Sequence, residues 1–224
     1  MKTTKQKCKI PFGVVVTGIL LFFCSLSQAQ KPEPPIPVEF LLGHKEMYSQ
    51  IVIKKKFAPE SKFNFFGLAT YSATHDNTIE ENRAIMISQI SYDVGKGFGL
   101  MAGADYNSFS GFSPILGPQH NFASKKFLAV TVASFFLNED SDFKIFGLYE
   151  YKPPINDVWS LYTRFQFIYN TSLAEGSHNI SYVYLRAGVK RNNLIFGLGA
   201  NLDWAGPNKD FGDNYGGFVR WEFN

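Results

Sequence analysis

The chain has 224 residues, enough for one sizeable domain, and 17% of them are aromatic while only 18% are charged. Its formal net charge is +3, but four lysines lie in the first nine residues, and without them 18 Lys and Arg stand against 19 Asp and Glu. The remainder has no basic excess, so nucleic-acid binding loses its electrostatic argument. Both cysteines, Cys8 and Cys24, also lie in the first thirty residues. Thiolate chemistry and thiolate metal sites are therefore excluded from the rest of the chain.

The first thirty residues follow the order of a secretory signal. A basic stretch, MKTTKQKCK, precedes an apolar run from Phe12 to Cys24, and SLSQAQ supplies small residues for cleavage after Ala29. The apolar run is shorter than the ~20 residues of a spanning helix. We therefore predict a signal peptide over 1–29, with a retained anchor or a lipid-modified Cys24 as alternatives. Residues 30–45, which begin QKPEPPIP, are predicted to form an extended leader.

From residue 46 onward the sequence alternates with a period of two, and turn residues separate the segments. In LIFGLGANLDW (194–204), one face is wholly apolar and ends in Trp204, whereas the other carries glycines, Asn201 and Asp203. Segments of this kind are long enough to cross a bilayer on a tilt, which takes about 9–11 residues. The ten predicted strands are 46–57, 62–73, 83–94, 98–107, 125–136, 143–151, 159–169, 182–190, 194–204 and 215–224.

The apolar faces are richer in large residues than those of a soluble β-sandwich, the alternative fold, whose polar face meets water. Aromatic rings are favoured at membrane interfaces. Only a closed barrel satisfies every backbone hydrogen bond in lipid. The sequence therefore predicts an all-β fold, an antiparallel transmembrane β-barrel of about ten strands over 46–224, or twelve if 37–45 or 108–124 contributes. The expected interface aromatics are Tyr151, Trp159, Tyr169, Trp204, Tyr215, Trp221 and Phe223.

This organisation resembles that of Gram-negative outer-membrane β-barrel proteins, the porin-like and OmpA-like superfamily. The resemblance rests on the signal, the cysteine-free amphipathic strands and a final strand that ends FVRWEF. Such barrels commonly end in Phe, which their assembly machinery recognises, whereas here Phe223 is followed by Asn224. The resemblance implies the outer membrane as location, and outer-membrane lipid and the barrel-assembly machinery as partners. No functional family is matched, and a small-solute or protein partner stays open.

A ten-strand barrel conflicts with the usual placement of loops. Outer-membrane barrels have short periplasmic turns, long external loops and both termini in the periplasm. Counting strands back from the C-terminus puts 171–179 and 205–213 outside, as expected. The same count puts the long segment 108–124 inside and the tight turn VGKG (94–97) outside.

No catalytic, metal-binding or cofactor-binding motif is present: HExxH, GxSxG, the P-loop and the dinucleotide fingerprint are all missing. We therefore predict no enzyme activity and no cofactor. The only nucleophile–base candidates are His120 with Ser124, and His178 with Ser177 or Ser181. NEDSD (138–142) is a charged turn or a loose Ca²⁺ site. The histidines after the signal, each more than four residues from the next, are His44, His75, His120 and His178.

Charged residues on the polar faces must point inward, because an Arg in mid-membrane costs about 2–4 kcal/mol. They either pair and plug the barrel or line a narrow selective pore, and about ten strands enclose little free space. We predict a packed or narrow polar lumen with a structural or binding role or limited passive transport of small solutes. The alternatives are an outer-membrane lipid hydrolase or deacylase, and an adhesion or assembly protein acting through its long loops. The predicted lumen residues are Asp105, Glu150, Arg164, Arg186, Asp203, Arg220 and Glu222.

Overall fold

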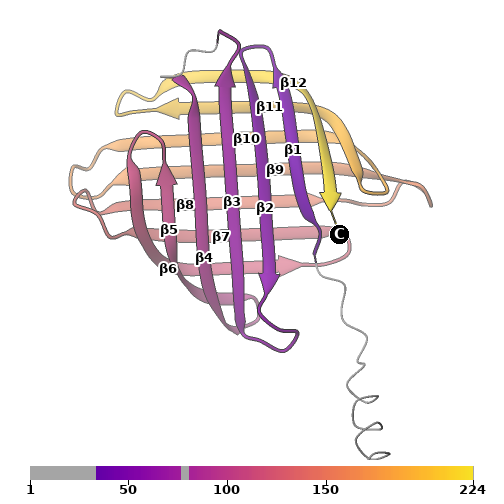
Figure 1. The fold of residues 1–224 in the computed structure, drawn as a ribbon, viewed down its shortest axis with the longest axis horizontal. Helices are drawn as coiled ribbons and strands as arrows, with labels where there is room; N and C mark the ends of the chain where they lie inside the picture. The colour runs from indigo at the N-terminus through magenta and orange to yellow at the C-terminus, as the bar shows by residue number, and fades with distance from the viewer. Residues whose placement is uncertain (1–33, 77–80, 224) are drawn as a thin grey trace, which may run out of the picture. The chain divides into compact units, whose positions relative to one another are not determined.

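Twelve antiparallel strands form one closed barrel in the computed structural model, which describes residues 34–76 and 81–223 (Figure 1). The predicted signal peptide lies outside these residues. Each strand pairs with its neighbours in the chain, and the first strand closes the barrel by pairing with the last. The strands are β1 (Ile36–Gly43), β2 (Glu46–Lys56), β3 (Phe63–Thr74), β4 (Arg83–Gly95), β5 (Phe98–Asn107), β6 (Gly111–Ala123), β7 (Phe127–Phe136), β8 (Asp142–Tyr151), β9 (Trp159–Ser172), β10 (His178–Arg191), β11 (Leu194–Ala205) and β12 (Asp210–Phe223).

The strands of one wall run across those of the opposite wall, as Figure 1 shows for β1–β5 in front and β7–β11 behind. This crossing follows from the tilt that a closed sheet imposes on its strands. Because the strand number is even, β1 begins and β12 ends at the same end of the barrel, which we call the terminal end. We call the opposite end the loop end. Within residues 34–76 and 81–223, no helix has the length and apolarity to cross a membrane.

Alternation along each strand gives the barrel an apolar outside. In β11, Leu198 is 74% exposed on the outer face, whereas Ile195 and Asn201 on the inner face are fully buried. Large apolar side chains are exposed on the outer face of every wall, and the closed ladder leaves no strand edge unpaired. Such a surface suits hydrocarbon, where backbone groups cannot bond to water. The predicted all-β fold, an antiparallel closed barrel, is confirmed.

The strand that the sequence count left out in the middle of the chain is β6. Its Pro114 and Pro118 have no N–H to donate, and prolines demote a segment that otherwise alternates. Both rings face outward, and the register of β6 with β7 is interrupted between Leu116 and Gln119. The segment 108–124 is therefore mostly a strand and not a long loop.

The other additional strand is β1, which corrects the predicted leader over 30–45. Residues 36–43 pair with β12 on one side and β2 on the other, so the barrel begins at Ile36. Pro37 and the prolines before it made this stretch resemble a linker. The barrel thus has twelve strands, the higher of the two predicted numbers.

The two added strands also resolve the loop conflict. With β6 counted, the turn at Lys96 lies at the terminal end, together with the other turns that follow even-numbered strands. The connections 173–177 and 206–209 lie at the loop end. In an outer-membrane barrel both termini are periplasmic, so with that orientation the terminal end is the periplasmic side.

We expect Leu116→Arg to destabilise the folded protein in lipid vesicles by about 2–4 kcal/mol, because Leu116 lies outward in the middle of β6 and a charge there would face hydrocarbon. The matched control is Leu137→Arg in the loop-end connection after β7, which should cost only about 0–1 kcal/mol. Equilibrium unfolding in urea from vesicles measures both. Equal losses would show that β6 does not cross the hydrocarbon.

Candidate functional site

The inner faces of β1 and β8–β12 concentrate charged side chains in the barrel interior. Successive side chains of a strand point to opposite faces, so these residues share the inner face with the other inward residues two positions away. Space for them depends on Gly199, since a Cβ at this position would lie 2.9 Å from Cδ of Arg186 and also clash with Leu41. The glycines of β11 therefore make room for an arginine on β10.

The centre of this region is Glu39 on β1. Its Oε1 accepts a hydrogen bond from Nη2 of Arg164 at 2.7 Å and another from Nε of Arg186 at 2.8 Å. Both guanidinium groups are fully buried. Arg186 also donates from Nη1 to Oδ1 of Asn201 at 2.9 Å. One carboxylate thus links the first strand of the barrel to β9 and β10.

A second group of ion pairs lies toward the terminal end, around Glu150 and Glu222. Nη1 of Arg220 lies 2.6 Å from Oε1 of Glu150 and donates to the Tyr162 hydroxyl at 2.8 Å. Nζ of Lys152 lies 3.0 Å from Glu150 and 2.6 Å from Glu222. Lys190 also pairs with Glu222. These contacts tie β8, β9, β10 and β12 together.

Two further pairs lie toward the loop end. Nη2 of Arg83 donates to Oδ1 of Asp203 at 3.0 Å, and the Tyr184 hydroxyl donates to the same oxygen at 3.0 Å. Nζ of Lys144 lies 2.5 Å from Oδ2 of Asp105. Both pairs join strands that are not neighbours, so they bridge the interior rather than one ladder.

The interior charge does not balance. The networks around Glu39, Glu150 and Glu222 hold three carboxylates and five cations, a net charge of +2: Arg164, Arg186, Arg220, Lys152 and Lys190. Within the described part of the chain, Nε and Nη1 of Arg164, Nη2 of Arg186 and Nε of Arg220 are buried without a hydrogen-bond partner. The polar half of the lumen is therefore electropositive.

The other half of the lumen is apolar. Inward side chains such as Leu68, Ile87 and Val132 form one buried cluster, which has most of its members on β3–β9 and extends to the other strands. Opposite walls touch through this cluster, because the ring of Phe66 on β3 lies 6.2 Å from that of Phe146 on β8. Side chains therefore meet across the interior, where Tyr162, Gln166 and Asn201 are fully buried, and a pocket lined by residues of β7–β12 opens on the outer wall.

The structure places every predicted lumen residue on the inner face. Glu150, Arg164, Arg186, Arg220 and Glu222 lie together in the networks described above, whereas Asp105 and Asp203 form separate pairs. The sequence analysis missed Glu39, Arg83, Lys144, Lys152 and Lys190, which are the partners of these residues. Alternation within VEFLL could have identified Glu39 as inward if the prolines before it had not favoured a leader.

The predicted interface aromatics all point outward. Tyr151, Trp159, Trp221 and Phe223 lie at the terminal end, and Tyr169 and Trp204 lie toward the loop end. Tyr215 lies nearer the middle of β12, where the ring stacks on His44 at a centroid distance of 5.7 Å. The rings at the two ends occupy the depths at which amphipathic rings meet headgroups.

One of the two predicted histidine–serine combinations is brought together. A β-bulge between His178 and Ile180 turns both His178 and Ser181 outward, with the His178 Nε2 3.0 Å from the Ser181 Oγ. The His178 Nδ1 lies 2.7 Å from the Gly206 carbonyl oxygen, which can only accept, so Nδ1 carries the proton and Nε2 accepts from the serine. Ser124 instead bonds within its own turn, away from His120.

The remaining candidates have structural partners. Oδ2 of Asp142, in the NEDSD segment, accepts from the side chain of Asn138 at 2.9 Å, and its Oδ1 accepts from Asn179 at 2.7 Å. His75 lies 2.9 Å from the Gly43 carbonyl oxygen. Among residues 34–76 and 81–223, no three His, Cys, Asp or Glu side chains gather as a metal site would require.

Comparisons with known proteins give distant likenesses in structure only. No protein-family model matches the chain, and neither does any curated protein. It is similar to the KdgM porin, with a TM-score of 0.47 and 10% identity over 84% of this chain and 99% of that one. The NanC porin gives 0.47 and 9% over 85% and 99%, and a BenF-like porin from Pseudomonas fluorescens Pf-5 gives 0.39 and 12% over 76% and 67%. These values carry no information on what this chain binds or transports.

We expect Glu39→Gln to cost about 3–5 kcal/mol of unfolding free energy, because the change leaves two buried guanidinium groups without their carboxylate. The matched control is Asp213→Asn, which removes an exposed carboxylate paired with Lys45 and should leave stability unchanged within error. Urea unfolding in detergent micelles, followed by tryptophan fluorescence, measures both variants. A Glu39→Gln protein as stable as the control would contradict the role given to this carboxylate.

Proposed function

We propose that the chain is an outer-membrane barrel that does not conduct solutes, with a structural and binding role carried by its outer wall and its loop end. The observation that carries this proposal is the filled interior, in which Tyr162, Gln166 and Asn201 are fully buried. A barrel of twelve strands is wide enough to enclose space, yet here side chains of opposite walls meet directly.

The chemistry of the interior also favours a closed barrel. An ion crossing the lumen would have to pass the apolar side chains around Phe66 and Phe146, which cannot replace its hydration shell. It would also have to break the bonds of Glu39 to Arg164 and Arg186, which are charge-assisted and desolvated. The interior therefore acts as the core of the protein, and its ion pairs hold the wall together.

A second candidate function, lipid-directed acyl hydrolysis, is favoured by the pair of His178 and Ser181. The pair has the hydrogen bond of a general base to a nucleophile and faces outward beside the ring of Tyr169, 5.6 Å from the imidazole. Gly206 orients the ring through its carbonyl oxygen, so no carboxylate takes part. A Ser–His pair without a carboxylate is a weaker catalyst than a complete triad, so we rank this candidate second.

We expect the purified, folded protein to give no discrete conductance steps in a planar lipid bilayer at either polarity, because its lumen is filled. Folding is checked first by the difference in gel mobility between unheated and boiled samples, and a known porin serves as positive control. Steady steps from the wild type would contradict the proposal. If such steps lost anion selectivity in Arg164→Gln, they would identify the electropositive half of the lumen as the path.

Hydrolysis is tested with a fluorophosphonate probe, which labels only serines activated by a base. Because the proposed function is structural and does not use this pair as a catalyst, we expect no labelling of the wild type and no acyl release from detergent-solubilised phospholipid. Labelling that disappears in Ser181→Ala and His178→Gln, but persists in the control Ser177→Ala, would instead establish the second candidate.

A further inference from the structure

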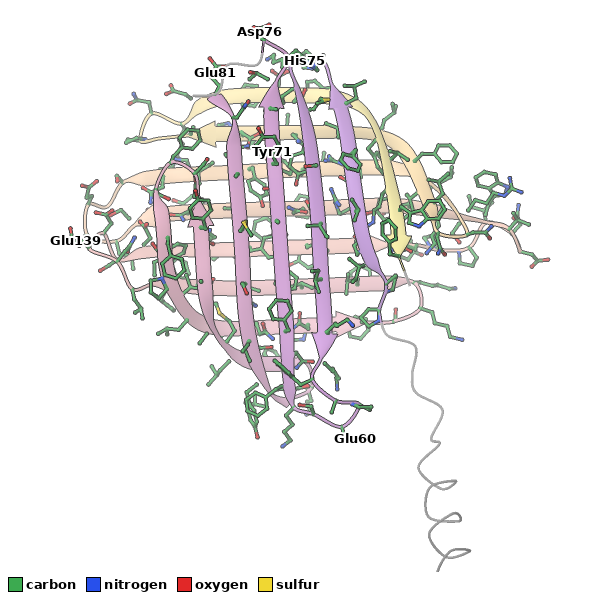
Figure 2. The ribbon with its side chains drawn as sticks, in the orientation of Figure 1. Glu60, Tyr71, His75, Asp76, Glu81 and Glu139 are labelled. Carbon is green, nitrogen blue, oxygen red and sulfur yellow. The ribbon has the colours of Figure 1, made fainter. Side chains whose placement is uncertain are left out.

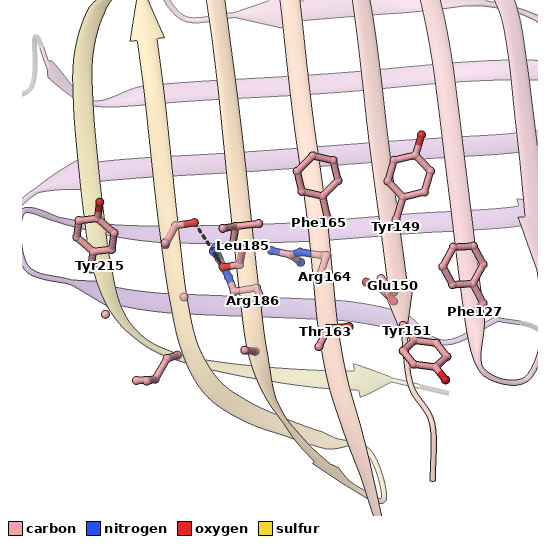
Figure 3. Close-up of a pocket in the computed structure, with 15 residues that line it drawn as sticks. Phe127, Tyr149, Glu150, Tyr151, Thr163, Arg164, Phe165, Leu185, Arg186 and Tyr215 are labelled. Carbon is pink, nitrogen blue, oxygen red and sulfur yellow. Dashed lines mark hydrogen bonds between the residues drawn. The ribbon is translucent and has the colours of Figure 1, made fainter.

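The outer wall of the barrel carries a groove of about 770 Å³ over β7–β12. Its floor consists of small side chains, Thr163, Ala187 and Ala200, and larger side chains such as Phe165 and Leu185 stand beside them. Figure 3 shows Phe165 and Leu185 on the opposite side of the strands from the lumen residue Arg164. The groove is therefore part of the surface that faces lipid.

The strand register explains the shape of the groove. Thr163 on β9 lies directly opposite Ala187 on β10, whose own partner on β11 is Leu198. Ala200 on β11 lies one outward position further along, opposite Leu185, so the small residues follow a diagonal line across three strands. Large side chains stand on the outward positions to either side of the small residues, and they do not fill the space above an alanine. A channel is therefore left between the large side chains. The depression runs across the strands and is apolar.

A pair of unneutralised cations lies at one end of the groove. Lys125 and Lys126 form the turn before Phe127, which lines the groove, and both are exposed. The Lys152 N–H donates to the Lys126 carbonyl oxygen at 2.7 Å, which fixes this turn beside Tyr151 at the end of β8. No carboxylate pairs with either lysine in the part of the chain that the structure describes.

The exposed charges of the barrel are divided between its two ends. Figure 2 shows Asp76, Glu81 and Glu139 at the loop end, and Glu60 at the opposite end. Cations nevertheless predominate at the terminal end, where the exposed ones include Lys56, Lys62, Lys96, Lys125, Lys126 and Arg191. Basic residues beside a membrane surface attract anionic headgroups by about 1 kcal/mol each.

We propose that the groove and the Lys125–Lys126 turn together bind one anionic phospholipid of the periplasmic leaflet. An acyl chain lies over Thr163, Ala187 and Ala200, and the phosphate pairs with the two lysines. The apolar channel accounts for the chain, and the unneutralised lysines at its terminal end account for the preference for an anionic headgroup. The proposal rests on the placement of the terminal end at the periplasmic side, and not on whether the lumen conducts.

Native mass spectrometry of the detergent-purified full-length protein tests the site. It is titrated separately with phosphatidylglycerol and with phosphatidylcholine of the same acyl chains. We expect phosphatidylglycerol to bind roughly ten- to thirtyfold more tightly, because its headgroup has a net negative charge beside two lysines, whereas the choline of phosphatidylcholine neutralises its phosphate. The preference should disappear in Lys125→Gln with Lys126→Gln. It should persist in the control Lys56→Gln with Lys96→Gln, which removes the same charge from the last residue of β2 and from the turn after β4, at the same end of the barrel.

A substitution in the floor of the groove tests the contact with the acyl chain independently of the contact with the headgroup. Ala187→Phe fills the groove without changing charge and should weaken both lipids alike, while its gel mobility before and after boiling confirms folding. Equal affinities of the wild type for both lipids, or a preference unaffected by the two lysines, would overturn the proposal. So would a floor variant that binds like the wild type, or a dimer that Ala187→Phe abolishes, since this would assign the groove to a second copy.

Discussion

A charge without a partner is expensive in a membrane, and the structure of this barrel follows from that constraint. Its inner face carries arginines on β9, β10 and β12, and the nearest anion that can satisfy two of them is Glu39 on β1. The carboxylate therefore has to be delivered by a strand that is remote in sequence, and Gly199 has to leave room for Arg186. Removal of one partner of such a pair is far more costly than replacement of the whole pair by apolar residues.

The apolar half of the interior solves the same problem in another way. Where β3–β7 face the lumen, most inward positions near mid-depth are apolar, and the charged residues Arg83 and Asp105 are each paired across the interior. The barrel thus has an apolar outer surface and a partly apolar interior, with the ion-pair networks confined to one side. The inward polar residues Gln89, Ser91 and Gln119 lie among the buried apolar side chains of this half.

Alternation, aromatic strand ends and the resemblance to outer-membrane barrels predicted the fold correctly, because period-two patterns report directly on which face of a strand is wet or dry. The strands β1 and β6 were predicted only within the alternative of twelve strands, because Pro37, Pro114 and Pro118 are local signals against a strand. The closed ladder around these prolines compensates for the lost N–H donors. The inward charges were also identified from their face alone. Their partners could not be identified from the sequence, because a pair such as Glu39 and Arg164 forms only when the barrel closes and produces no pattern in residue spacing. The bulge beside His178 and the groove over Ala187 likewise depend on register between strands.

The pairing of β1 with β12 has a consequence for how the chain acquires its structure. Ile36 lies opposite Phe223, so the contact that closes the cylinder joins residues from almost the two extremes of the described chain. Contacts of such wide separation form late, because the entropy of the intervening polypeptide must be overcome first. The seam between β1 and β12 is therefore the natural last step of assembly, and until it forms, two bare strand edges and an unmatched pair of guanidinium groups remain for a chaperone or the insertion apparatus to shield.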